Sequence, residues 1–225
     1  MKPVPQYADR LCFERELAGR GRLQVAGVDE AGCGPLAGPV VAAAVMFPSA
    51  WLTAGLPENL LGLNDSKQLT ESQREEFFTL LTTDSKIQRG VAVIPVEIID
   101  RINILQATHQ GMREALAQLA VVPDHVLVDG RPVKSLRLPN TPLVKGDARS
   151  YTIAAASILA KVTRDRLMLD YDRQYPGYGF AAHKGYGTPQ HLAALIALGP
   201  CPQHRRSFAP LRPPKPETGE LFPCD

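Results

Sequence analysis

An unbroken apolar stretch from Pro39 to Phe47 constrains the fold of this chain more than any other feature. A run of this length without a polar side chain predicts a strand that is covered on both faces. A second apolar run, Val25–Val28, precedes it and ends in two adjacent acids, Asp29 and Glu30. Acids at the end of a buried strand cost free energy unless a cation binds them, and a divalent ion held by oxygens is the usual partner. The sequence therefore predicts a sheet with a cation-binding end.

The loop between these two runs carries three glycines, Gly32, Gly34 and Gly38. Glycines let the backbone approach a ligand closely, whereas in a plain turn the two acids would only cap neighbouring amides. We favour a ligand site, because two further acids follow suitable strands. A dinucleotide-binding loop is excluded, since the third glycine of that motif lacks the required spacing and a strand follows the loop.

The further acids are Asp129, which follows an apolar run at 125–128, and Asp147, which follows Lys145-Gly146. Carboxylates at the ends of neighbouring strands can share a metal ion. Strand alternation points Glu30 away from Asp29, so Glu30 reaches the site only if the chain turns after it, or through its carbonyl oxygen. Three or four acids suit a pair of Mg²⁺ or Mn²⁺ ions whose shells are completed by phosphate and water. No histidine cluster supports these acids in the sequence, which argues against zinc.

Alternating strand and helix patterns predict one α/β domain with a helical C-terminal addition. The expected strands span residues 25–28, 39–47, 87–94, 125–128 and 142–144. The expected helices span residues 8–17, a segment after a capping box at Thr70, 96–119 with a bend near Gly111, 151–171 after a Ser150 cap, and 189–199 after a Thr188 cap. Residues 48–63 are expected to form a loop. We expect a helical lead-in at 1–22, the main domain at 23–210 and a loose proline-rich tail at 211–225.

Charge and cysteine content limit the partners and the compartment. The net charge of +2 implies nothing by itself. Between Arg131 and Arg166, however, eight Lys or Arg residues stand against two acids, which suits a polyanionic substrate or, alternatively, an ordinary solvated face. The four cysteines form no CxxC pair, and no segment reads as a leader or a membrane span, so we expect a cytoplasmic protein with reduced thiols. Cys201 and His204 resemble only half of a zinc site.

Motifs along most of the chain resemble those of the bacterial type 2 ribonucleases H (RNase HII). The matching segments are GVDEAGCGPLAGPV (27–40), LNDSK (63–67), INILQATHQGM (102–112), VLVDG (126–130), VKGD (144–147), AAASILAKVTRDR (154–166), HKGYGT (183–188) and HRRSFAP (204–210). The resemblance implies an RNase H-like mixed sheet flanked by helices. It also implies an endonuclease that cuts the RNA strand of RNA–DNA hybrids, and nicks duplex DNA on the 5′ side of single ribonucleotides, leaving a 5′-phosphate.

When the motifs are matched, the metal-binding acids of that family correspond to Asp29, Glu30, Asp129 and Asp147. The resemblance also implies Mg²⁺ or Mn²⁺ as the cofactor and two-metal phosphoryl transfer as the mechanism. Ribonucleotide excision and primer removal are the implied roles, and a monomer the implied state. Asp165 lies four residues after Lys161 on a predicted helix, so we interpret it as an ion-pair partner and not as a ligand.

Recognition of RNA requires contact with a 2′-hydroxyl. Gly32, Cys33 and Gly34 are the expected backbone contacts to the sugar, and the resemblance places Tyr186 against the nucleotide at the RNA–DNA junction. The alternative for Tyr186 is a half-buried packing role. The expected phosphate contacts are Lys67, Lys145, Lys184, Arg205 and Arg206.

One position departs from the family pattern, because Cys33 stands where the family carries an arginine between the two glycines. A lost phosphate contact predicts duplex binding weaker by about 1 kcal/mol. A thiol beside a metal site also suggests sensitivity to oxidation. Two alternatives remain: a type 3 ribonuclease H, which carries an extra N-terminal domain, and a binding module that has lost catalysis.

Overall fold

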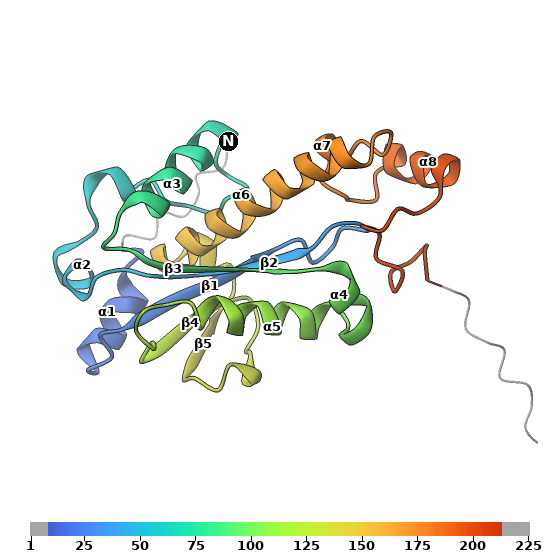
Figure 1. Cartoon of the computed structure of the whole chain (residues 1–225). Helices are drawn as coiled ribbons and strands as arrows, with labels where there is room; N and C mark the ends of the chain where they lie inside the picture. Colours follow the sequence, from blue (N-terminus) through green and yellow to red (C-terminus); the bar gives the residue numbers. More distant parts are fainter. Residues whose placement is uncertain (1–8, 213–225) are drawn as a thin grey trace, which may run out of the picture.

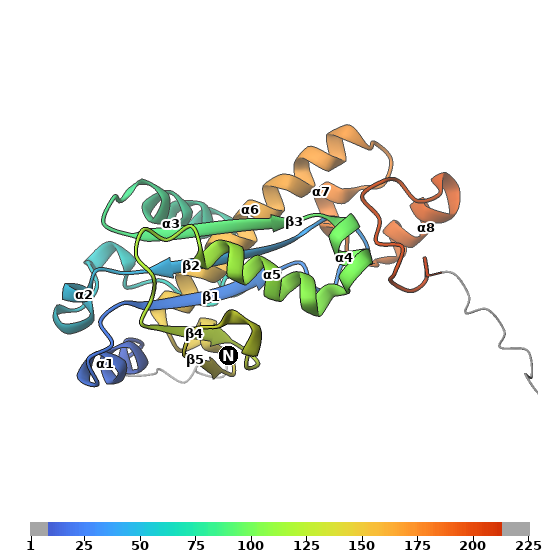
Figure 2. The same ribbon diagram turned by 60° about the horizontal axis from the view of Figure 1, so that its bottom comes forward.

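A computed structural model describes residues 9–212 as a five-stranded sheet with helices on both faces, as Figures 1 and 2 show. The strands are β1 (Val25–Ala31), β2 (Val40–Met46), β3 (Gln88–Ile94), β4 (His125–Asp129) and β5 (Asn140–Leu143). The helices are α1 (Cys12–Gly19), α2 (Ser49–Ala54), α3 (Glu71–Thr83), α4 (Val96–Ile102), α5 (Ile104–Leu116), α6 (Tyr151–Gln174), α7 (Phe180–His183) and α8 (Pro189–Leu198), with short 3-10 turns η1 (Glu58–Leu60), η2 (Lys134–Leu136) and η3 (Gly146–Ala148). The predicted α/β class, with its helical C-terminal addition, is confirmed.

The sheet is mixed and has the order β3-β2-β1-β4-β5. β2 pairs antiparallel with β1 and β3, whereas β4 is parallel to β1 and β5 is parallel to β4. The register sets Val28 of β1 beside Val128 of β4. The next residue along each of these parallel strands is an acid, Asp29 or Asp129, so both acids lie at the same end of the sheet.

The two faces of the sheet belong to separate cores, because side chains alternate along each strand. One face of β1 and β2, including Val25 and Val41, packs with α6 and with the α1–α3 region. The other face, including Val28, packs against α5. Figure 1 shows α6 above the sheet and α5 below it. Helix α6 runs so close to β1 that a Cβ atom added at Gly27 would lie 2.3 Å from the backbone carbon of Thr152. Such close packing fixes the position of α6 relative to the strand that carries the acids.

The start of α6 is tied to α1 through a buried carboxyl group. The Ser150 hydroxyl caps α6 by accepting from the Ile153 amide, as predicted, and donates to Glu14 over 2.7 Å. The Thr152 hydroxyl donates to the same Glu14 oxygen over 2.8 Å. Leu11 lies in the α6 core. The predicted lead-in therefore shares the core of the main domain.

Residues 96–119 form two helices, where the sequence predicted one helix bent at Gly111. The break falls at Asn103, whose backbone φ of 67° ends α4 and whose side chain accepts from the Gln106 amide to begin α5. Asparagine adopts a positive φ more readily than most other residues, and it caps helices well. Gly111 instead allows α5 to approach Ala42, since an added Cβ would lie 3.1 Å from the Ala42 Cβ.

Other boundaries follow the prediction more closely. The capping boxes at Thr70 and the Thr188 cap are present. The predicted loop at 48–63 contains α2 and η1, and α7 was not predicted. Most of the proline-rich tail and the first part of the lead-in lie outside the described residues. None of the helices within residues 9–212 has the length and apolarity needed to cross a membrane.

Candidate metal and nucleic-acid site

Strand β1 carries the first two acids of the site within its length and not after its end. The ladder pairs Asp29 with Ala43 and Glu30 with Ala42 of β2, so the strand continues to Ala31. The prediction that the strand stops at Val28 is wrong, because the β2 backbone keeps pairing past that point. Alternation sends the two acid side chains to opposite faces of the sheet, as expected. Both nevertheless line the same cleft at this end of the sheet.

The other two acids come from β4 and from the turn η3. Asp129 ends β4, and its Oδ1 accepts a hydrogen bond from the Gly146 amide over 2.6 Å. This bond ties η3, which contains the buried Asp147, to the strand end. Gly146 is needed for close packing, because an added Cβ would lie 2.6 Å from Ile153 Cδ1.

These acids repel one another electrostatically. Burial raises the pKa of Asp29 well above its ordinary value, and the charges of Glu30 and Asp129 raise it further. Burial, followed by the charges of Asp65 and Asp129, raises the pKa of Asp147 to about 6. The structure therefore brings the four predicted acids into electrostatic contact.

A lysine partly offsets this negative charge. The Lys67 ammonium is half-exposed at the cleft, where burial lowers its pKa. The charges of Asp65, Asp147, Asp29 and Asp129 outweigh that effect, and the net result is a raised pKa. One lysine cannot balance four or five carboxylates, so the site still favours cations.

The donor set suits divalent ions of the hard, oxygen-binding kind. Within residues 9–212, no three His, Cys, Asp or Glu side chains already form a closed set of metal ligands. An open set of this kind leaves coordination positions for water and phosphate oxygens, which is what a catalytic Mg²⁺ or Mn²⁺ pair requires.

A cleft of about 300 Å³ joins Asp29 and Glu30 to the glycine loop, and Asp129 and Asp147 are not among its lining residues. It is lined by Asp29, Glu30, Ala31, Gly32, Cys33, Gly34, Ser66, Lys67, Ser157, Lys161, Arg164 and Tyr186. The predicted contacts Gly32, Cys33, Gly34, Lys67 and Tyr186 are thus brought together. The Tyr186 ring lies beside Gly34, since a Cβ added there would be 3.6 Å from its Cε1 atom. Tyr186 is 48% exposed, a value that fits both a junction contact and the alternative of a half-buried packing role.

Sequence reasoning missed several residues around the acids. Asp65 acts on Asp147 electrostatically, and the Ser157 hydroxyl donates to the Ser66 hydroxyl over 2.8 Å at the cleft wall. Asp65 and Ser66 lie in the LNDSK segment and Ser157 in the alanine-rich part of α6, so the motifs held the signal. Lys161 pairs with Asp165 over 2.9 Å, which confirms Asp165 as an ion-pair partner.

Arg205 is not placed as a phosphate contact, which corrects the prediction. Its side chain is fully buried. The guanidinium donates to the carbonyl oxygens of Gly32, Cys33, Gly38 and Pro39. Burial, with a smaller effect from Arg164, lowers its pKa to about 9. Arg205 therefore shapes the glycine loop from behind and does not reach solvent.

Arg164 supports the same loop from α6. Its guanidinium donates to the carbonyls of Pro39, Ala37 and Lys184, and the side chain is 1% exposed. Gly32, with a φ of 99°, allows this arrangement, because an added Cβ would lie 2.1 Å from Arg164 Nε. Gly32 therefore makes room for the Arg164 side chain, in addition to letting a ligand approach the loop backbone.

The remaining predicted phosphate contacts lie near the surface. Lys67, Lys145 and Arg206 are exposed. Lys184 is partly buried, and its ammonium donates to the Ala181 carbonyl. Their contact with phosphate stays a prediction.

Cys33 lies on the α5 side of the cleft. Its Sγ is 3.5 Å from Glu30 Oε1 and 3.3 Å from the Thr108 hydroxyl. Burial, followed by the Glu30 charge, raises its pKa to about 12. Because the thiolate is the reactive form, a raised pKa lowers the expected reactivity of Cys33, and its sensitivity to oxidation stays a prediction. The zinc alternative at Cys201 and His204 also finds no support, since His204 Nδ1 accepts from the Cys201 amide.

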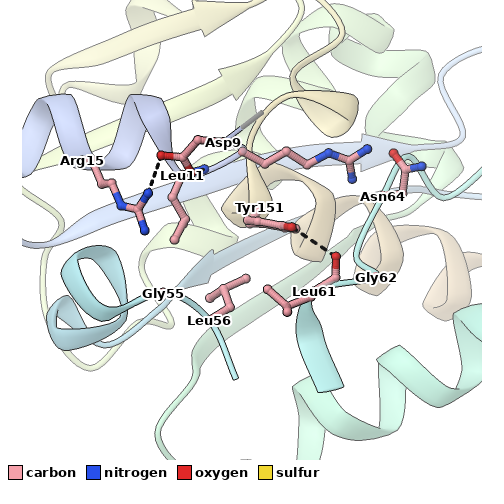
Figure 3. A pocket seen from close by; sticks show the side chains of 10 residues that line it. Asp9, Leu11, Arg15, Gly55, Leu56, Leu61, Gly62, Asn64 and Tyr151 are labelled. Atoms are coloured by element: carbon pink, nitrogen blue, oxygen red, sulfur yellow. Dashed lines mark hydrogen bonds and ion pairs between the residues drawn. The ribbon is translucent and has the colours of Figure 1, made fainter. Parts of the chain in front are cut away.

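A larger hollow of about 600 Å³ lies away from the four acids, between α1, the 55–64 segment and the start of α6. Figure 3 shows polar pairs within it: Asp9 pairs with Arg15, and the Tyr151 hydroxyl donates to the Leu61 carbonyl. Since it contains none of the interacting acids, we place the chemistry in the smaller cleft.

Comparison with known proteins gives a consistent result. The ribonuclease HII family model matches residues 26–211. Ribonuclease HII of Geobacter metallireducens is 55% identical over 196 residues, which cover 87% of this chain and 88% of that protein. The crystal structure of the ribonuclease H2 from Pyrococcus horikoshii OT3 is similar with a TM-score of 0.68 and 30% identity, over 84% of this chain and 95% of that one. Bst-RNase HIII, solved in complex with Mn²⁺, shares the fold at a TM-score of 0.61 and 19% identity, over 84% of this chain and 68% of that one.

Proposed function

This chain belongs to the ribonuclease HII family, and we propose that it hydrolyses the RNA strand of RNA–DNA hybrids and nicks duplex DNA on the 5′ side of single ribonucleotides. The observation that carries the proposal is the meeting of four carboxylates from β1, β4 and η3 beside a glycine loop. The match to the ribonuclease HII family favours a type 2 over a type 3 ribonuclease H. The presence of all four acids favours an enzyme over a binding module.

Asp29, Glu30, Asp129 and Asp147 would hold two Mg²⁺ or Mn²⁺ ions. Such ions, when bound, activate an attacking water and stabilise the leaving 3′ oxygen. The chain keeps the acids in place through the β1–β2 ladder and through the hydrogen bond from the Gly146 amide to Asp129. Burial and repulsion favour the neutral acids, so cation binding would compete with protons at this site.

The glycine loop would recognise the ribose through its backbone amides. The carbonyls of Gly32 and Cys33 point inward to Arg205. In planar trans peptides, the amides of Cys33 and Gly34 must then point the opposite way. Outward amides are suitable donors to a 2′-hydroxyl, which is the group that separates RNA from DNA. The Tyr186 ring beside Gly34 would pack on the deoxyribose across the junction and disfavour a hydroxyl there.

The cellular setting follows from the proposed activity. We propose ribonucleotide excision and RNA primer removal as the roles, and a cytoplasmic monomer with residues 23–210 as the catalytic domain. Lys67, Lys145, Lys184 and Arg206 would bind the phosphates of the duplex by charge.

A cleavage assay on duplex DNA with one ribonucleotide tests the proposal. The assay is run with Mg²⁺, Mn²⁺ or EDTA, and with Asp129→Asn alongside the unmodified protein. We expect a metal-dependent nick 5′ of the ribonucleotide that Asp129→Asn abolishes. Cleavage of long hybrids alone would contradict the junction part of the proposal, and no cleavage by the folded protein would favour a binding module.

A further inference from the structure

Three imidazoles pack together behind the loop that carries Tyr186. The rings of His183 and His191 stack at a centroid distance of 4.5 Å, and His191 Nε2 lies 3.0 Å from His204 Nε2. All three side chains are buried, with His191 and His204 at most 1% exposed. The phosphodiester chemistry proposed above uses none of them, so their placement calls for another explanation.

The hydrogen-bond partners determine the tautomer of His191. Its Nδ1 lies 2.9 Å from the Tyr186 carbonyl oxygen, which can only accept, so Nδ1 carries a proton. In a neutral ring, Nε2 must then accept. The partner His204 is neutral at ordinary pH, because burial, with a smaller effect from His191, lowers its pKa to about 4.

The partners of His204 lead to the same assignment independently. The Cys201 amide can only donate, and it lies 3.0 Å from His204 Nδ1, whereas the Cys201 carbonyl is farther away at 3.3 Å. His204 Nδ1 therefore accepts, and its Nε2 carries the proton that it donates to His191. A single donor chain results, from His204 to His191 and from His191 to the Tyr186 carbonyl.

The rest of the loop is tied down on both sides of Tyr186. The Gly185 amide donates to His183 Nδ1, and the Gly185 carbonyl accepts from the Leu36 amide of the glycine loop. The Tyr186 amide donates to the His183 carbonyl. The Tyr186 carbonyl accepts from the Thr188 amide over 2.8 Å and from His191 Nδ1 over 2.9 Å, and His191 is its side-chain partner. The exposed Tyr186 ring projects from this backbone beside Gly34.

We propose that His191, held in one tautomer by His204, is a positioning residue that sets the Tyr186 ring at the RNA–DNA junction and so determines the preference for single embedded ribonucleotides. The inference rests on the proposed function, since it requires Tyr186 to contact the junction. It assigns substrate preference to a buried residue that touches neither substrate nor metal.

The test compares kcat/KM on duplex DNA containing one ribonucleotide with kcat/KM on a long RNA–DNA hybrid. The ratio of the two is the junction preference. His191→Phe keeps a ring but removes the side-chain donor to the Tyr186 carbonyl and leaves only the Thr188 amide on that oxygen. We expect the preference to fall about tenfold, equivalent to about 1.4 kcal/mol, through KM of the single-ribonucleotide substrate. His191→Asn keeps an amide donor near the Nδ1 position, and should restore the preference to within about threefold.

Tyr178→Phe is the matched control for general damage to the cluster. Tyr178 packs against His204, and its hydroxyl donates to the Gly199 carbonyl, but no contact links it to Tyr186. We expect it to lower stability without changing the preference. An equal loss of preference in Tyr178→Phe, or an unchanged preference in His191→Phe, would overturn the inference.

Tyr186→Ala separates this failure from failure of the proposed function. A lost preference in Tyr186→Ala with an unchanged preference in His191→Phe refutes only the positioning role. An unchanged preference in Tyr186→Ala refutes the junction role of Tyr186, and the inference with it.

Because the Phe variant could misfold, ¹⁵N NMR of the histidine rings in the unmodified protein gives a second test. We expect His191 protonated at Nδ1 and His204 at Nε2, and the opposite tautomer of His191 would overturn the inference.

Discussion

The carboxylate end of the sheet and the arginine-backed glycine loop are neighbours that handle buried charge in opposite ways. At the sheet end, burial and neighbouring carboxylates raise the pKa of Asp29 and of Asp147, and Lys67 is a nearby counter-charge. Behind the loop, Arg164 and Arg205 are equally buried, but backbone carbonyls occupy their donors. In the function proposed above, a cation completes the first region, whereas the second region carries its own cations.

The difference separates the part of the site that binds a cofactor from the part that holds its shape. Unpaired buried charges cost stability and are kept where function needs them. Guanidiniums that satisfy several carbonyls stabilise a loop that has few side chains of its own. Removing a charge from the acid cluster should therefore stabilise the folded protein, whereas removing a charge from behind the loop should destabilise it.

The largest expected effect is on activity in Asp29→Asn. The amide keeps the hydrogen bond that Asp29 Oδ1 accepts from the Glu30 amide, so the fold should persist. We expect metal-dependent cleavage to fall about a thousandfold, equivalent to about 4 kcal/mol of transition-state stabilisation. In EDTA the same variant should unfold at a higher temperature, because repulsion in the cluster is relieved. A lower unfolding temperature for Asp29→Asn would contradict the view that the buried acids destabilise the folded protein.

The next effect is on stability in Arg205→Met. Loss of the guanidinium leaves buried carbonyls of the glycine loop without a donor, so we expect the free energy of unfolding to drop by about 3 kcal/mol or more. Urea denaturation measures it, with Arg206→Met, at the exposed neighbouring position, as the matched control. Equal stabilities of the two variants would show that the arginine does not hold the loop.

A smaller effect is expected for substrate binding in Cys33→Arg. A cation added on the ligand side of the loop should lower KM about fivefold, which corresponds to about 1 kcal/mol. Steady-state kinetics on the single-ribonucleotide duplex measures it. An unchanged or higher KM would refute this account.

Cys33→Ser should match the unmodified protein in sensitivity to peroxide, because burial keeps the Cys33 thiol protonated.

The smallest effect concerns the pH dependence of stability in Glu14→Gln. Burial raises the pKa of Glu14 above its ordinary value, so the folded state holds this proton more tightly than the unfolded state. Its contribution to stability is fully present below pH 4.5 and is lost as pH rises through the folded pKa. We expect the variant to lose less stability than the unmodified protein between pH 4 and pH 8 in urea titrations. Parallel pH profiles would contradict the assignment.

Sequence patterns predicted the parts of this molecule that depend on local signals. The apolar run at 39–47 became the interior strand β2, and the caps at Thr70, Ser150 and Thr188 begin helices. The acids at strand ends were found because a buried carboxylate is unusual wherever it occurs.

Tertiary contacts decided what the sequence did not predict. Asp29 lies inside β1 because β2 continues to pair with it. Arg205 looked like a phosphate contact because nothing in a surface-like HRRSF segment shows that the side chain turns inward. The break at Asn103 depended on one residue adopting a left-handed conformation, which a helical apolar pattern does not reveal.

Calorimetric titration of the free protein with Mn²⁺ at pH 6, in two buffers of different ionisation enthalpy, tests the central claim most directly. The claim is that the buried acids are an incomplete site that takes up divalent cations in place of protons. Because the pKa of Asp147 is about 6, we predict Mn²⁺ binding with release of protons, and loss of that binding in Asp29→Asn but not in Arg206→Met. Binding of equal strength in Asp29→Asn, or binding without proton release, would contradict it.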